Sequence, residues 1–212
     1  MANVLLGVTG SVAAIYTKDL YESLSADGHS VKVVATDAAR YFFNPDTIGA
    51  AAVVTLDADE WPAPHYQRGA PVLHIELRRW AELFLIAPLD ANTLAKLALG
   101  LADNCLTCVY RAWDRIRPLV LAPAMNTLMW EHPATARHLR QIAEDMGAGT
   151  LAGGLSLGQI VDSINGQPAP LRVVAPISKR LACDDVGVGA MAERDAILGA
   201  LRALNVNNQK NN

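Results

Sequence analysis

The sequence predicts an α/β protein: one domain built on a doubly wound parallel sheet, with helices on both faces. Short apolar segments alternate along the chain with longer amphipathic ones, which is the pattern of consecutive βαβ units. Polar or glycine residues directly follow several apolar segments, at the strand ends where such sheets bind ligands. With 212 residues, 51% of them hydrophobic, the chain is long enough to bury one substantial core.

Five short apolar runs are the expected strands. Residues 83–87 are nearly all apolar, which predicts a strand buried on both faces. The five runs cover residues 4–8, 31–35, 83–87, 118–122 and 171–176. Helices are expected over the segments with helical spacing, at residues 12–24, 38–43, 94–99, 103–113, 133–146 and 193–204. The domain therefore spans residues 1–204, and the polar residues 205–212 are expected to form a disordered tail.

Glycine and proline residues mark helix ends and loops. Pro133 begins the helix of residues 133–146 and Gly147 ends it. Three segments without clear periodicity are expected to be loops, and the last of them is able to close over a ligand. They are an irregular loop in 47–73, a long flexible loop or hairpin at 149–167, and a glycine-bearing loop at 179–189.

Composition and charge exclude several classes of function. The net charge is -3 and Lys and Arg form no cluster, which argues against nucleic acid or an anionic membrane as the main partner. The apolar run of residues 3–8 is too short for a signal peptide, and no run of about 18 apolar residues is present to span a bilayer. We therefore expect a soluble, cytoplasmic protein.

The three cysteines predict neither a disulfide framework nor a metal site. Their number is odd and nothing indicates secretion. Cys105 and Cys108 form a CxxC inside a predicted helix without a partner pair elsewhere, so buried thiols are favoured over a metal or redox role. Cys183 differs, because Lys179 and Arg180 precede it and favour its thiolate.

Four predicted strand ends carry groups that suit a ligand. They are Gly10 with Ser11, Thr36, residues 90–93, and residues 124–126. Because these ends converge on one crevice, a phosphate-bearing cofactor is the default hypothesis. The pattern alone leaves three interpretations open: an electron carrier, a nucleotide-binding enzyme and a ligand-binding regulator. His74, a lone histidine among apolar neighbours, is by pattern alone more often structural.

Longer motifs carry a resemblance to a known family. Residues 123–130, PAMNTLMW, match the PxMNxxMW motif of the flavin-containing cysteine decarboxylases, whose fold is Rossmann-like (flavodoxin-like). Further motifs resemble the branch of that family that acts in coenzyme A synthesis. These motifs lie at residues 87–96, 103–104, 106–108, 111–114 and 179–183, so that the resemblance covers nearly all of residues 4–204.

The resemblance implies FMN-dependent decarboxylation of 4'-phosphopantothenoylcysteine to 4'-phosphopantetheine. Direct loss of the carboxylate would leave an unstabilised carbanion. Oxidation of the carbon that bears sulfur gives a thioaldehyde first, CO2 then leaves, and the resulting enethiolate is reduced again. The resemblance also implies a homotrimer with FMN near the subunit interfaces, so that one site draws residues from two chains.

The resemblance assigns roles by matched position. His74 matches the catalytic histidine, the base of the oxidation step, and Cys183 matches the catalytic cysteine, a proton donor during reduction. The expected substrate-binding residues are Asn126, Met129, Arg180, Leu181 and Ala182, with Asn126 on the carboxylate. The expected FMN-binding residues are Gly10, Ser11, Val12, Thr36, Ala38, Asp90, Ala91, Asn92, Thr93 and Ala124.

Two alternatives follow from the same family. Some members are non-catalytic regulators of a protein phosphatase, and these tend to carry long acidic extensions or lack a catalytic residue, whereas this chain keeps His74, Asn126 and Cys183. Others act on peptidyl cysteine or prenylate flavin, but the motif at residues 179–183 favours the branch that acts on phosphopantothenoylcysteine.

Overall fold

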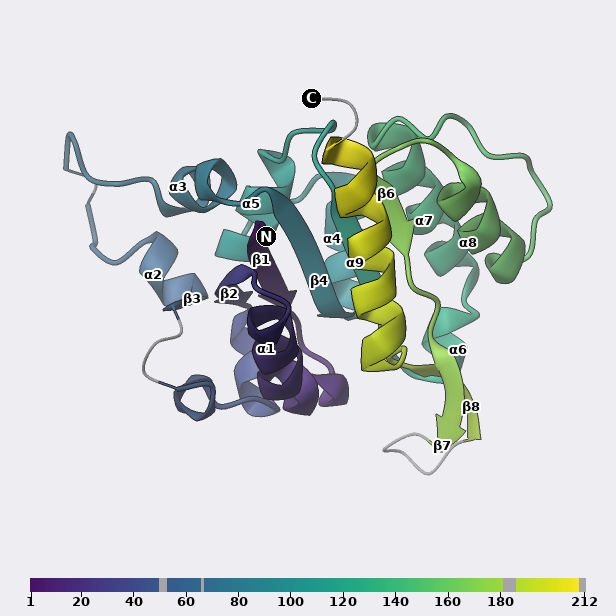
Figure 1. The fold of residues 1–212 in the computed structure, drawn as a ribbon, viewed down its shortest axis with the longest axis horizontal. Coiled ribbons are helices and arrows are strands. Elements are labelled where there is room, and N and C mark those ends of the chain that lie inside the picture. The colour runs from purple at the N-terminus through teal and green to yellow at the C-terminus, as the bar shows by residue number, and fades with distance from the viewer. Residues whose placement is uncertain (50–52, 66, 181–185, 210–212) are drawn as a thin grey trace.

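A six-stranded parallel sheet forms the centre of the molecule. The computed structural model describes residues 1–49, 53–65, 67–180 and 186–209. Within these ranges the strand order is β3-β2-β1-β4-β5-β6, and β7 and β8 form a separate antiparallel hairpin (Figure 1). The prediction of a single domain with a doubly wound sheet is confirmed.

The strands and helices that the sequence predicts occur in the predicted order, together with further elements that it did not predict. The strands are β1 (Asn3–Val8), β2 (Ser30–Ala35), β3 (Val53–Leu56), β4 (Leu83–Leu89), β5 (Leu119–Pro123), β6 (Leu171–Val173), β7 (Ile177–Arg180) and β8 (Val186–Ala190). The α-helices are α1 (Thr17–Ala26), α2 (Asp57–Glu60), α3 (Leu73–Trp80), α4 (Ala91–Leu99), α5 (Cys105–Arg111), α6 (Thr127–Trp130), α7 (Pro133–Asp145), α8 (Leu157–Gly166) and α9 (Arg194–Gln209). Three short 3-10 helices are η1 (Val12–Tyr16), η2 (Asp37–Tyr41) and η3 (Pro45–Thr47).

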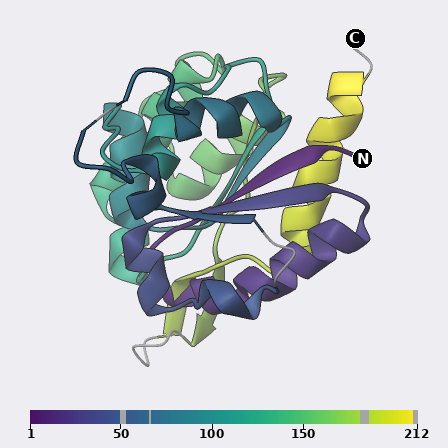
Figure 2. The ribbon, with the colours of Figure 1, turned by 90° about the vertical axis from the view of Figure 1, so that its left-hand side faces the viewer.

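Two apolar layers hold the helices against the two faces of the sheet. On one face, side chains such as Phe84 and Leu121 pack against α3, α4, α5, α7 and α8. On the other face, side chains such as Leu6 and Val33 pack against α1 and α9. All seven residues of β4 are buried, as expected for a central strand of a parallel sheet. Figure 2 shows the helices on either side of the sheet.

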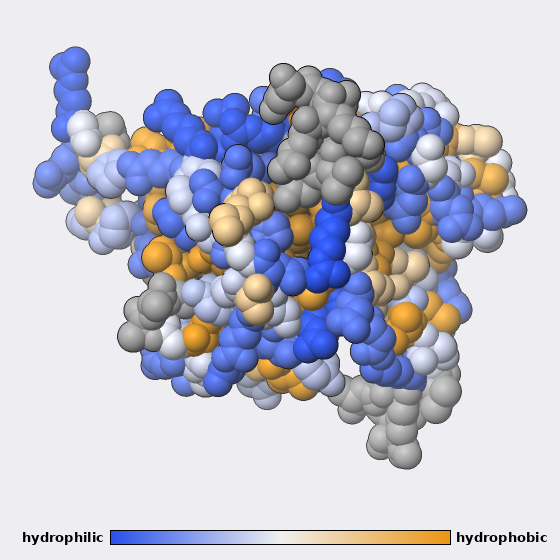
Figure 3. All heavy atoms as spheres, in the orientation of Figure 1, coloured by the Kyte–Doolittle hydropathy of each residue, from blue (hydrophilic) through white to orange (hydrophobic). Residues whose placement is uncertain are grey.

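Ion pairs tie α9 to α1 across the surface of the second face. Arg194 lies 3.2 Å from Asp19, and Arg202 lies 2.6 Å from Asp27. Figure 3 shows this face, with hydrophilic side chains spread among apolar ones. In the part of the chain that the structure describes, no helix combines the length and the apolar character that crossing a membrane requires.

Two of the predicted loops contain regular structure. The segment 47–73 holds β3 and α2, and β3 pairs in parallel with β2 at the edge of the sheet. The segment 149–167 holds α8, so the prediction of a loop or hairpin there was wrong. A capping box begins this helix, because Ser156 Oγ accepts from Gln159 N–H at 3.3 Å and Gln159 Oε1 accepts from Ser156 N–H at 2.9 Å.

The C-terminal quarter also differs from expectation. Most of segment 179–189 belongs to the β7–β8 hairpin instead of an irregular loop, although residues 181–185 lie outside the described part. The helix α9 continues past the predicted end at Leu204, so residues 205–209 are helical and not the expected disordered tail. Strand β6 is shorter than predicted and ends at Val173.

Candidate functional site

Three turns meet around Gly10 at the carboxyl edge of the sheet. Gly10 follows β1, Ala38 follows β2 and Asp90 follows β4. A Cβ built on Gly10 would lie 2.7 Å from Ala38 Cβ and 3.1 Å from Asp90 Oδ2. Glycine is therefore required here because the turns approach so closely, and Gly10 lies next to two other predicted FMN-binding residues.

Hydrogen bonds from Thr9 fix two of these turns to each other. Thr9 Oγ1 donates to the Pro88 carbonyl at 2.9 Å and accepts from the Asp90 N–H at 2.7 Å. The side chain of Thr9 is fully buried. The sequence indicated Thr9 only as part of a turn, because nothing along the chain shows which strand end it will contact.

Capping side chains order the first turn after each strand. Ser11 Oγ accepts from Ala13 N–H at 3.4 Å and Thr36 Oγ1 from Ala39 N–H at 3.3 Å. Asp90 Oδ1 accepts from Thr93 N–H at 2.6 Å. These caps leave other N–H groups of the same turns directed toward the carboxyl edge, where they favour an anion.

The other predicted FMN-binding residues differ in exposure. Val12, Ala38 and Asn92 are exposed, and Ala91 is partly exposed. Thr93 and Ala124 are buried. Ala124 N–H donates to the Leu89 carbonyl at 2.9 Å, which places the end of β5 beside the end of β4.

The motif at residues 123–130 forms the turn from β5 into α6. Asn126 begins α6, and its Oδ1 accepts from Leu128 N–H at 2.9 Å. Leu128 and Met129 are exposed by 76% and 52%, whereas Trp130 is buried. The predicted substrate-binding residues Asn126 and Met129 therefore lie on one short helix at the carboxyl edge.

The hairpin lies directly on this turn. Met125 N–H donates to the Gly189 carbonyl at 2.9 Å. A Cβ built on Gly189 would overlap the Met125 carbonyl oxygen, and one built on Gly187 would overlap Thr127 Oγ1. The glycines of β8 are therefore needed for close packing of the hairpin backbone on the start of α6. The predicted residues Leu181, Ala182 and Cys183 lie outside the described residues, and of Arg180 only the backbone is described, at the end of β7.

His74 is held by a buried carboxylate that the sequence did not reveal. Glu60 Oε1 lies 2.5 Å from His74 Nδ1, and Glu60 Oε2 accepts from His74 N–H at 3.0 Å. The Glu60 side chain is 3% exposed and that of His74 is 24% exposed. Glu60 lies in the segment predicted to be an irregular loop, which explains why no pattern pointed to it.

The helix that carries His74 lies apart from α6 and the hairpin of the same chain. This helix, α3, lies at the top left of Figure 1, whereas α6 and the hairpin lie at the lower right, and Figure 2 shows the same vertical separation. The far end of α3 lies beside the start of β1, where Asn3 Nδ2 donates to the Trp80 carbonyl at 3.1 Å. One chain therefore presents two separate groups of site residues.

Cys105 and Cys108 are free thiols on α5. Burial raises the pKa of the Cys105 thiol, and the nearby Glu60 carboxylate raises it further. A protonated, buried thiol agrees with the structural role that the sequence favoured. Among the residues that the structure describes, no three His, Cys, Asp or Glu side chains are arranged to hold a metal ion.

Apolar side chains are exposed near the crevice. Tyr16 and Ile15, which follow the Gly10 turn, are 54% and 56% exposed, and Val12 is 43% exposed. With Leu128 and Met129 they place several large apolar groups in water around the carboxyl edge. Exposure of this kind marks a surface that a ligand or another protein chain covers.

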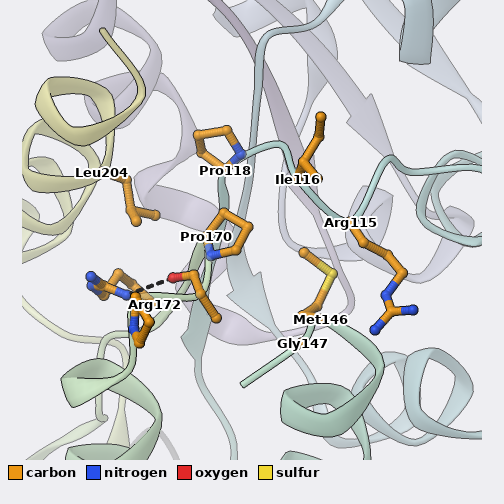
Figure 4. A pocket seen from close by; sticks show the side chains of 10 residues that line it. Arg115, Ile116, Pro118, Met146, Gly147, Pro170, Arg172 and Leu204 are labelled. Carbon is orange, nitrogen blue, oxygen red and sulfur yellow. Dashed lines mark hydrogen bonds between the residues drawn. The ribbon is translucent and has the colours of Figure 1, made fainter. Parts of the chain in front are cut away.

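The two described cavities lie elsewhere. A cavity of about 470 Å³ lies where β5 and β6 begin, between Pro118 and Pro170 (Figure 4). Arg172 lines it and donates to the Ala169 carbonyl at 3.0 Å. A second cavity of about 290 Å³ adjoins β7 and α1. Neither of these two cavities is lined by a predicted site residue.

Comparison with known proteins agrees with the geometry. A family model described as Flavoprotein matches residues 1–205. Over 204 residues the chain is 45% identical to phosphopantothenoylcysteine decarboxylase of Mus musculus, and the match covers 95% of this chain and 86% of that protein. The decarboxylase of Oryza sativa subsp. japonica is 45% identical over 199 residues, covering 94% of this chain and 79% of that protein.

Solved structures are similar over the same range. A variant of PPC decarboxylase complexed with pantothenoylaminoethenethiol has a TM-score of 0.77 and 42% identity, covering 95% of this chain and 97% of that chain. The FMN binding protein AtHal3 has a TM-score of 0.74 and 43% identity, covering 95% of each chain. The chain therefore belongs to the Flavoprotein family, in its branch of phosphopantothenoylcysteine decarboxylases.

Proposed function

We propose that this protein decarboxylates 4'-phosphopantothenoylcysteine to 4'-phosphopantetheine with bound FMN, a step of coenzyme A synthesis. The observation that carries the proposal is the meeting of Gly10, Ala38 and Asp90 in one crevice, with the turn of Asn126 at the same edge of the sheet. Relatives at 45% identity bear the name of this activity. A similar solved structure is complexed with pantothenoylaminoethenethiol.

The crevice fits a flavin mononucleotide. The capped turns after β1 and β2 supply N–H donors at helix starts, which suit a phosphate. Asp90 is partly exposed and Asn92 is exposed. Their polar side chains suit hydrogen bonds with the hydroxyl groups of a ribityl chain. When bound, FMN supplies the chemistry of taking a hydride equivalent from the carbon that bears sulfur and later returning it.

The protein's own groups bind the substrate and move protons. Asn126 would hold the substrate carboxylate through its amide, with Met129 beside it as part of the pocket wall. His74 would accept the proton that leaves the substrate thiol during oxidation. Cys183 would donate a proton as the enethiolate is reduced, while Arg180, Leu181 and Ala182 would contact the substrate from the hairpin.

We further propose that the protein is a homotrimer whose sites lie between subunits. The separation of α3 from α6 and the hairpin within one chain supports this arrangement (Figure 1). The His74 of one subunit would then face the FMN held by the crevice of a neighbour. The exposed apolar side chains of Val12, Ile15 and Tyr16 would be covered by that contact.

The first test is the activity itself. We expect the purified protein to be yellow, to retain FMN through gel filtration, and to release CO2 from phosphopantothenoylcysteine. Protein that stays colourless after mixing with FMN would refute the flavin site. Protein that binds FMN but releases no CO2, and instead inhibits a protein phosphatase, would support the regulatory alternative.

The second test separates the two catalytic roles. We expect His74→Asn to bind FMN but to leave it oxidised when substrate is added, because the thiol proton has no acceptor. We expect Cys183→Ser to release CO2 but to stall before reduction of the enethiolate. Flavin absorbance and CO2 release in a single turnover measure both steps. Full turnover by either variant would contradict the role assigned to that residue.

A further inference from the structure

Glu60 directs both of its carboxylate oxygens at one residue. Oε2 accepts from the backbone N–H of His74 at 3.0 Å, and Oε1 lies 2.5 Å from its ring nitrogen Nδ1. The Glu60 side chain is 3% exposed, so water competes little for either oxygen. A buried carboxylate with one oxygen on a histidine ring nitrogen resembles the orienting carboxylate of catalytic triads in its geometry.

Helix capping explains only one of the two contacts. The residue before α3 is Val72, whose side chain cannot cap the helix, and Glu60 Oε2 replaces that cap at the His74 N–H. The bond from Oε1 to the ring is not needed for capping. It instead determines which ring nitrogen of His74 carries the proton, because an ionised carboxylate only accepts.

The surroundings keep this carboxylate in place. The Cys105 thiol on α5 lies within hydrogen-bonding reach of Glu60, and its raised pKa keeps it protonated and able to donate. Cys105 is fully buried, so α5 closes the side of Glu60 that faces the core. The CxxC cysteine Cys105 therefore has a structural use beside Glu60.

We propose that Glu60 is a positioning residue that holds His74 in the Nδ1–H tautomer, so that Nε2 is free to take the substrate thiol proton. The role of His74 as the base of the reaction rests on the proposed function. The effect of Glu60 on the His74 tautomer does not depend on it. In the oxidation step the S–H proton goes to Nε2 and the hydride equivalent from the adjacent carbon goes to FMN, so that the C–S single bond becomes C=S. Glu60 gains and loses no proton in this step.

Glu60→Gln tests the proposal with little change in shape. The glutamine oxygen is expected to take the His74 N–H, and its NH2 then donates to Nδ1, which moves the ring proton to Nε2. We expect kcat to fall by about 100-fold or more, with KM changed less than about threefold. Flavin reduction in a single turnover should slow by the same factor.

The tautomer is measured without any activity. Nitrogen-15 NMR of the histidine rings distinguishes the two tautomers, and His74→Asn identifies the His74 signals. We expect the Nδ1–H form in the wild-type protein and in Glu60→Asp, which keeps the charge, and the Nε2–H form in Glu60→Gln. An Nε2–H form in the wild-type protein would overturn the proposal even if Glu60→Gln failed to fold.

Asp59→Asn is the matched control. Asp59 lies beside Glu60 in α2 but accepts from Leu56 N–H at 2.8 Å and not from His74. We expect this variant to keep the wild-type tautomer and the wild-type kcat.

Unchanged kcat and unchanged tautomer in Glu60→Gln would show that Glu60 is only a cap. If the wild-type protein and all variants lack decarboxylation but show the expected tautomers, the proposed function is refuted and the positioning role of Glu60 is still supported.

Discussion

At the scale of single residues, Asp57 shows how burial opposes a charge. Its Oδ2 accepts from the Asp37 N–H at 2.8 Å at the start of α2. Burial raises the pKa of this carboxyl above its usual value, and the nearby Asp37 carboxylate adds to the rise. The backbone N–H groups of Asp37 and Cys105, and more weakly Lys96, act in the opposite direction without cancelling it. A raised pKa means that ionised Asp57 destabilises the fold at neutral pH.

We predict that Asp57→Asn stabilises the protein at pH 7 and not in acid. The amide keeps the oxygen that accepts from Asp37 but removes the buried charge. The free energy of unfolding should rise by up to about 1 kcal/mol at pH 7, and the gain should disappear below pH ~4, where wild-type Asp57 is protonated in both states. Urea unfolding at both pH values, at one protein concentration, measures the difference. Asp46→Asn is the control, because Asp46 is exposed. An equal rise in the free energy of unfolding in both variants would contradict the prediction.

At the scale of elements, the hairpin and α6 form one unit because of glycine. Gly187 and Gly189 leave room for Thr127 and for the Met125 carbonyl, and the Met125 N–H bond to Gly189 at 2.9 Å joins the two segments. The predicted substrate-binding residue Asn126 lies between these contacts. Displacement of the hairpin would therefore also disturb the substrate side of the crevice.

We predict that Gly189→Ala separates the hairpin from α6. The added methyl group overlaps the Met125 carbonyl, so the hairpin must shift, at a cost of roughly 1–3 kcal/mol. Limited proteolysis should then cut faster between residues 177 and 190, and KM for substrate should rise. Gly199→Ala in α9 is the matched control, because nothing lies within 4 Å of its added Cβ. It should stabilise the protein by about 0.4–1 kcal/mol, and equal proteolysis of both variants would count against the hairpin contact.

At the scale of the whole molecule, the site residues of one chain lie in two places. Glu60 and His74 are held together at α3, while Gly10, Asp90 and Asn126 lie along the carboxyl edge of the sheet. Figure 1 shows α3 at the upper left of the molecule and α6 at the lower right. In the homotrimer that we propose, the two groups would meet at one ligand between neighbouring subunits, and each subunit would serve two sites.

We predict that two inactive variants complement each other. His74→Asn removes the base, and Asn126→Ser removes the amide but keeps a side chain able to cap α6. When both chains are co-expressed, random assembly pairs an intact His74 with an intact Asn126 at about one quarter of the interfaces. We expect about a quarter of wild-type decarboxylation from the mixture and none from either variant alone. No recovery in verified mixed oligomers would show that each chain forms its own complete site.

Much of the fold was predictable because burial follows local periodicity. The buried run of β4 and the capped turns at Thr36 and Asp90 appear in the sequence as strand and strand end. The helix α8 was missed because glycine and serine dominated the segment, although the Ser156 to Gln159 spacing is a capping-box signal. The strand β3 was missed because its four residues are too few to show a period.

The sequence by itself determined the sheet, the polar strand ends and the motif around Asn126, because these depend on residues close together along the chain. Only the tertiary structure decided that Glu60 holds His74 across an irregular segment, that Gly10 is enclosed by Ala38 and Asp90, and that α3 lies far from α6. Periodicity records which side of an element is buried. Contacts between distant elements depend on how the sheet twists and packs its helices, which no single segment encodes.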